Sequence, residues 1–146
     1  MTCRLTMTLI SELQEGNVGE DWKYQLDVEV VLKDGVVGQG SIEVSKHNLP
    51  SGVVREPYGT PAPQVLFSGD CAGELLLRSH LTATEVDVFV NDVGKIQKDL
   101  VMECPGPAGG TVTKEVDIAV AVRESPPILP RKAVFTLRVR FNLTCS

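Results

Sequence analysis

The chain has 146 residues, 42% of them hydrophobic and 23% charged, with a net charge of −5 at pH 7. This length and composition predict one globular domain over residues 1–146 and exclude a disordered or fibrous chain. The acidic balance argues against nucleic-acid binding, which relies on clustered Lys and Arg, and no apolar run reaches the roughly 18 residues of a membrane span.

Apolar and polar residues alternate along most of the chain, which predicts β-strands rather than helices. The expected strands cover residues 3–13, 23–32, 41–46, 65–67, 74–81, 85–90, 96–104, 112–122 and 133–145. Turn-forming residues at 16–19 and the Asp34-Gly35 pair separate the first three strands. The glycines at 35, 38 and 40 join two strands, so we expect a hairpin turn or bulge there and not a phosphate-binding loop.

The alternation breaks in two places. Residues 47–73 contain four prolines, which remove sheet hydrogen-bond donors, so this stretch is expected to cross the surface as a long loop. Residues 125–130 are predicted to form a stiff connector between the last two strands. The last strand would expose Arg138 and Arg140, and we expect acidic neighbours such as Glu115 and Asp117 opposite them.

Seven to nine strands closed by turn residues, with no helical period, predict an all-β fold, an antiparallel β-sandwich. Immunoglobulin-like, C2-like and jelly-roll topologies share this pattern, and strand order cannot be read from it. Val31, Ile10 and Val134 interrupt the alternation at positions expected to face solvent. This exception suggests a partly covered outer face, with a second subunit as one candidate for the cover.

The cysteines at 3, 71, 104 and 145 show no Cys-x-x-Cys spacing, which argues against a zinc ribbon or a thioredoxin-like motif. Because the N-terminal sequence has no signal-peptide pattern, we expect a cytoplasmic protein with buried free thiols, or a secreted one if the chain has been trimmed. The alternative is a Cys3–Cys145 bridge, together with Cys71–Cys104, that would stabilise the fold by about 4 to 5 kcal/mol.

Few residues suggest catalysis or metal binding. A small hydrolase would need Cys71 as nucleophile or His80 as base, but no sequence motif brings such groups together. Asp87, Asn91 and Asp92 flank one turn and could supply oxygens to calcium, the only cofactor that the sequence suggests. Asp and Asn are also favoured in turns for backbone reasons, so this metal set is a weak candidate.

The proline-rich loop is the strongest functional candidate, because long ordered loops in compact domains are usually functional. It carries groups suited to recognition, with Tyr58 as an aromatic anchor and Arg55, His47 and Gln64 as polar partners. The leading hypothesis is therefore a non-catalytic protein-binding or assembly module that presents loops and an edge strand to a partner or to a second copy as a homo-oligomer. The first alternative is a calcium-dependent ligand-binding sandwich, C2-like or carbohydrate-binding; the second is the small hydrolase.

Overall fold

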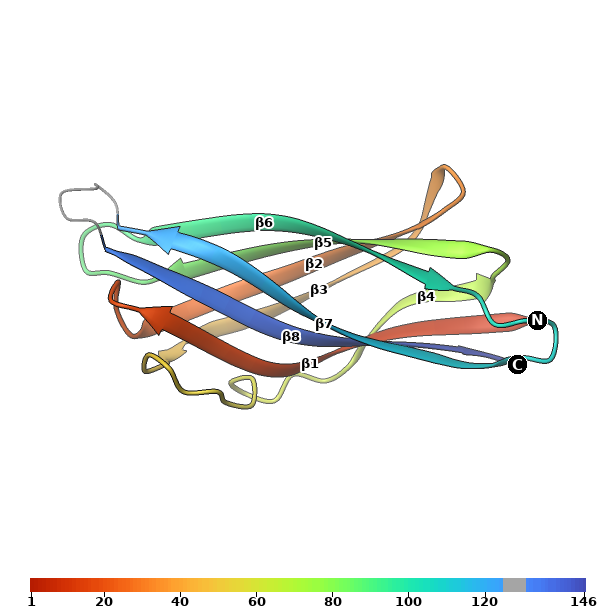
Figure 1. Cartoon of the computed structure of the whole chain (residues 1–146), viewed down its shortest axis with the longest axis horizontal. Coiled ribbons are helices and arrows are strands. Elements are labelled where there is room, and N and C mark those ends of the chain that lie inside the picture. The colour runs from red at the N-terminus through yellow and green to blue at the C-terminus, as the bar shows by residue number, and fades with distance from the viewer. Residues whose placement is uncertain (125–130) are drawn as a thin grey trace.

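The fold consists of eight antiparallel strands in two facing sheets (Figure 1). The computed structural model describes residues 1–124 and 131–146. The strands are β1 (Thr2–Gly16), β2 (Asp21–Leu32), β3 (Gly35–Asn48), β4 (Gln64–Asp70), β5 (Glu74–Glu85), β6 (Asp92–Glu103), β7 (Gly110–Arg123) and β8 (Lys132–Cys145). One sheet has the order β4-β1-β8-β7 and the other β3-β2-β5-β6.

The predicted all-β sandwich is confirmed, and the described residues contain no helix. Among them, accordingly, no helix has the length and apolar character needed to cross a bilayer. One predicted strand is wrong: β5 runs without a break to Glu85, and residues 86–91 form the loop that leads into β6. The predicted connector at 125–130 lies outside the described residues.

The inner faces of the two sheets bury a single hydrophobic core. Its aromatic centre joins the sheets, because Phe135 of β8 lies 5.7 Å from Trp22 and 4.8 Å from Tyr24, both in β2, measured between ring centroids. On the outer face of β7 and β8, the arginine prediction is confirmed. Arg138 pairs with Asp117 at 2.8 Å and Arg140 with Glu115 at 2.6 Å.

Two of the three exceptions to the alternation, Ile10 and Val31, have causes within the chain. The register between β1 and β8 shifts between Leu9 and Ser11, so Ile10 is the extra residue of a β-bulge and is half-buried. Val31 is buried on the outer face, where Leu76 of β5 lies opposite it. Burial of Val31 therefore needs no second subunit.

The edges of the two sheets approach each other on both sides of the sandwich. The glycines at 35, 38 and 40 lie within β3, and the predicted bulge is found there, because Val30 lies opposite Gly38 while Val31 lies opposite Val36. A Cβ at Gly38 would lie 2.0 Å from the carbonyl oxygen of Leu66 in β4. On the opposite side, Lys98 of β6 donates to the carbonyl of Asp117 at 2.7 Å, and Lys114 of β7 donates to that of Val101 at 2.8 Å. These lysines thus hydrogen-bond backbone carbonyls of both edge strands. The same carbonyls are then less available for pairing with a strand of another chain.

The two termini lie together at one end of the sandwich (Figure 1). There Cys3 of β1 and Cys145 of β8 are register partners and form a disulfide, and a second disulfide joins Cys71 to Cys104. The expectation of free thiols is therefore wrong, because pairing β1 with β8 brings the ends of the chain into contact. The alternative pairing is the one that the structure contains.

Candidate functional site

The bulge at Ile10 reverses the facing of the rest of β1. Before it, Cys3, Leu5 and Met7 point into the core; after it, Glu12 and Gln14 are the buried residues. A strand without the bulge would have turned both polar side chains to solvent. The sequence analysis missed Glu12 for this reason, and the out-of-phase Ile10 was the signal that could have revealed it.

A second bulge turns His47 inward. Near the end of β3 the register with β2 shifts, so that His47 lies opposite Trp22 while Val44 lies opposite Tyr24. His47 is therefore buried, and its Nε2 contacts Oε2 of Glu12. Its Nδ1 lies 2.8 Å from the carbonyl oxygen of Ser45, which can only accept, so Nδ1 carries a proton. The contact with Glu12 requires another proton, carried by either the imidazole or the carboxyl group.

The carboxyl group of Glu12 organises the surrounding polar groups. Its Oε1 accepts a hydrogen bond from the hydroxyl of Tyr24 at 2.8 Å and another from the backbone N–H of Tyr58 at 2.8 Å. Burial, with the adjacent Glu12 carboxylate, raises the pKa of Tyr24 above its ordinary value, so the phenol remains a donor. A buried carboxyl with three partners is satisfied, and it links β1, β2, β3 and the loop after β3.

The loop after β3 docks along the part of β1 that β4 leaves uncovered, since β4 pairs only with residues 2–7. Glu12 and Arg55 exchange backbone hydrogen bonds of 2.9 and 3.0 Å, as in a sheet ladder. Further along, the N–H of Gly52 donates to the carbonyl of Gln14 at 2.8 Å, and the N–H of Gly16 donates to the hydroxyl of Ser51 at 2.9 Å. Despite its prolines, this loop is tied to the sheet by backbone hydrogen bonds.

This loop exposes apolar side chains. Tyr58 is 53% exposed, although its ring stacks on His47 with ring centroids 4.6 Å apart. Val54 is 64% exposed and Val53 is also exposed, whereas Pro57 is buried. We call Val53, Val54 and Tyr58 the loop patch.

The four residues predicted to bind a partner have different positions. Tyr58 belongs to the loop patch, and Arg55 is exposed, with its Nη1 donating to the carbonyl of Asn48 at 3.1 Å. His47 is buried beneath Tyr58 and supports it from inside. Gln64 is exposed in β4, opposite Met7, and belongs to the sheet and not to the loop. The structure thus brings three of the four together around Glu12.

The predicted calcium-binding residues lie at the turn between β5 and β6. Asp87 and Asp92 meet there with Glu85, and one carboxylate oxygen from each of the three lies within 4.8 Å of the other two. The Oδ1 of Asn91 accepts a hydrogen bond of 3.1 Å from the N–H of Asp87. We call Glu85, Asp87 and Asp92 the carboxylate cluster.

The two residues proposed for a hydrolase are not brought into a catalytic arrangement. The sulfur of Cys71 is in the disulfide with Cys104 and offers no thiolate. His80 lies on the outer face of β5, with its Nε2 3.7 Å from the carboxylate of Glu29. Its side chain is partly exposed to solvent, as expected for a surface histidine.

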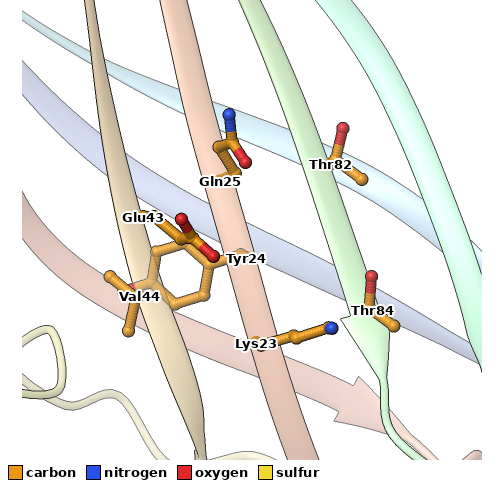
Figure 2. A pocket seen from close by; sticks show the side chains of 7 residues that line it. All are labelled: Lys23, Tyr24, Gln25, Glu43, Val44, Thr82 and Thr84. Carbon is orange, nitrogen blue, oxygen red and sulfur yellow. The ribbon is translucent and has the colours of Figure 1, made fainter.

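The outer face of the β3-β2-β5-β6 sheet has two hollows. One, of about 220 Å³, lies over β3, β2 and β5 (Figure 2). Its rim is mixed in charge, with Lys23 and Glu43 on neighbouring strands and Thr82 and Thr84 beside them. The other, of about 310 Å³, includes His80 and Glu29 in its lining. Neither hollow is lined by residues of the loop patch or of the carboxylate cluster.

Comparison with models of known protein families and with curated protein sequences found no match to this chain.

Proposed function

We propose that this protein is a non-catalytic protein-binding module that docks its partner through the loop patch, with Tyr58 as the anchor. The observation that carries the proposal is that Tyr58 is half-exposed and yet held in place. Its ring stacks on His47 and its backbone N–H donates to Glu12. An exposed aromatic ring that is already ordered loses little conformational entropy on binding, which is the property of an interface anchor.

The neighbouring side chains favour a protein partner. Val53 and Val54, in the same loop, add exposed apolar side chains, and the exposed Arg55 offers hydrogen-bond donors. Such a surface fits a protein that presents an apolar pocket bordered by acceptors. Docking by the loop is also favoured over docking by the edge strands β6 and β7, because Lys98 and Lys114 occupy carbonyls of those edges.

A catalytic role has less support. The sulfur of Cys71 is bonded to Cys104, so Cys71 offers no nucleophile to the hydrolase alternative. His80, the base of that alternative, lies on the outer face of β5 beside Glu29, away from this disulfide in the sheet register. The calcium-dependent alternative is favoured by a specific observation, the carboxylate cluster, which lies apart from the loop patch in the sequence.

The two disulfides also bear on where the protein works. Disulfides persist in oxidising compartments and are rare where glutathione and thioredoxin keep thiols reduced. We therefore propose an oxidising environment in place of the cytoplasm. Thiol counting on protein isolated from its source under alkylating conditions tests this proposal: unmodified cysteines point to an oxidising compartment, and four alkylated thiols point to the cytoplasm.

The docking proposal is tested with wild type, Tyr58→Ala, Tyr58→Phe and Phe89→Ala, a control that removes another exposed aromatic ring. Each immobilised protein is exposed to extracts of its source, and a protein retained by wild type but lost on Tyr58→Ala is purified and its Kd measured. We expect Tyr58→Ala to weaken binding about 30-fold, as for an interface hot spot, with the two other variants close to wild type.

Two results would change the proposal. Equal Kd values for wild type and Tyr58→Ala would place the docking surface elsewhere on the molecule. A dimer of wild type in light scattering that Tyr58→Ala abolishes would identify the partner as a second copy of the chain.

A further inference from the structure

We infer that the carboxylate cluster of Glu85, Asp87 and Asp92 binds a calcium ion at the end of the sandwich where β5 turns into β6. This inference is independent of docking by the loop patch. Glu85 and Asp92 are the last register pair between β5 and β6, and Asp87 lies in the loop between them. The hairpin therefore fixes two of the three carboxylates on paired strands.

The spacing of the oxygens suits calcium. Calcium binds carboxylate oxygens at about 2.3 to 2.6 Å, so two ligands on opposite sides of the ion lie about 5 Å apart. One oxygen from each of the three carboxylates lies within 4.8 Å of the other two. Three ligands from one hairpin leave positions for water, and calcium accepts varied ligand geometries, whereas magnesium demands an octahedron.

The independent observation that points to a ligand is the carboxylate of Glu85. This residue is only 5% exposed, and its Oε2 is buried without a hydrogen-bond partner among the residues that the structure describes. A buried carboxylate oxygen without a partner is costly, and the neighbouring carboxylates of Asp87 and Asp92 add repulsion. A bound calcium ion would reduce both costs, because it replaces the missing partner and offsets two of the three negative charges of the cluster.

The surrounding backbone is shaped around this carboxylate. A Cβ added to Gly19, in the turn between β1 and β2, would lie 2.1 Å from Oε1 of Glu85, so glycine allows the turn to close over it. Asp87 accepts a hydrogen bond of 2.6 Å from the N–H of Val88, and its own N–H donates to Asn91. These two bonds hold the loop that carries Asp87.

Without a cation, a proton bound to Glu85 reduces the negative charge of the cluster. Burial, then the charges of Asp87, Asp92 and Asp21, raise the pKa of Glu85 to about 7. Asp21 stands at the start of β2, and its backbone N–H offsets part of this rise.

Isothermal titration calorimetry of the full chain with CaCl₂, and separately with MgCl₂, tests the inference. We expect one calcium per chain with a Kd on the order of 0.1 to 1 mM, as in other weak calcium modules, and weaker binding of magnesium. Glu85→Gln and Asp92→Asn should weaken calcium binding at least about tenfold, because each removes one charged ligand. Asp34→Asn, which removes an exposed carboxylate from the turn between β2 and β3, is the matched control and should bind as wild type does.

Thermal unfolding separates a metal site from a structural cluster. Calcium should raise the Tm of wild type and of Asp34→Asn, while Glu85→Gln should unfold at a higher temperature than wild type in chelator and gain nothing from calcium. Absence of calcium binding to folded wild type, or equal binding by Glu85→Gln, would overturn the inference.

Discussion

The ring of Tyr58 lies parallel to the imidazole of His47, with 4.6 Å between the ring centroids and 5° between the planes. Both residues are attached to Glu12, His47 through its Nε2 and Tyr58 through its backbone N–H. A buried carboxyl group thus sets the position of an exposed aromatic ring. Loss of this carboxyl group should therefore destabilise the loop as well as the core.

Replacement of Glu12 should separate the loop from the sheet. Glu12→Ala leaves the hydroxyl of Tyr24, the N–H of Tyr58 and the imidazole of His47 without their partner, so we expect the unfolding free energy to fall by about 3 kcal/mol. Glu12→Gln keeps an acceptor for the first two and a donor for His47, and should lose less than half as much. Urea denaturation measures both values.

Hydrogen exchange locates the change. We expect faster exchange in the loop at residues 49–58 for Glu12→Ala, and protection near that of wild type for Glu12→Gln. Glu15→Gln, at an exposed position of the same strand, is the control. Unchanged protection of the loop in Glu12→Ala would show that the backbone bonds to Arg55 suffice to hold it.

The stability of the protein in chelator should fall as the pH rises through the titration of Glu85. Its pKa is raised from 4.5 to about 7 in the folded protein, so the folded state binds the proton more tightly than the unfolded state does. The favourable contribution is complete below about pH 4.5 and is lost by about pH 7. The shift corresponds to about 3 kcal/mol, which solvent screening reduces to on the order of 2 kcal/mol. Glu85→Gln should flatten this part of the profile, whereas Glu56→Gln, at an exposed position, should not.

Most of the fold could be predicted from the sequence because strand alternation records which face is buried. The strands around Leu26, Val120 and Leu137 follow a strict period of two, and the structure buries all three residues. Residues 85–90 also alternate, but Val88 and Phe89 are 88% and 93% exposed in a loop. Alternation over six residues is compatible with a strand and does not require one.

The site was less predictable, because two bulges form it. A bulge shifts the facing of all later residues in a strand, and it depends on pairing with another strand distant in the sequence. Glu12 and His47 therefore face each other for reasons that neither local sequence contains. Tyr58 was predicted as a partner-binding residue because the prolines and the length of its loop are visible in the sequence. Its stacking on His47 was not predicted.

Each disulfide should contribute to stability according to the length of chain that it closes. Cys3–Cys145 spans 142 residues and Cys71–Cys104 spans 33, for which loop entropy gives about 5 and about 3.7 kcal/mol. The Cys3→Ala, Cys145→Ala double variant should therefore unfold at a lower urea concentration than the Cys71→Ala, Cys104→Ala variant. The reverse order would mean that local packing, and not loop entropy, sets their contributions.

Two glycines of β3 should respond in opposite ways to the same substitution. A Cβ at Gly38 would meet the backbone oxygen of Leu66 at 2.0 Å, and a backbone atom cannot turn aside as a side chain can. We expect Gly38→Ala to lower the unfolding free energy by about 1 to 3 kcal/mol, because β3 and β4 must move apart. Gly35→Ala meets nothing within 4 Å and should be neutral or slightly stabilising, since alanine restricts the unfolded chain. Thermal unfolding of the two variants measures the difference, and equal Tm values would show that the two sheets do not approach each other at this edge.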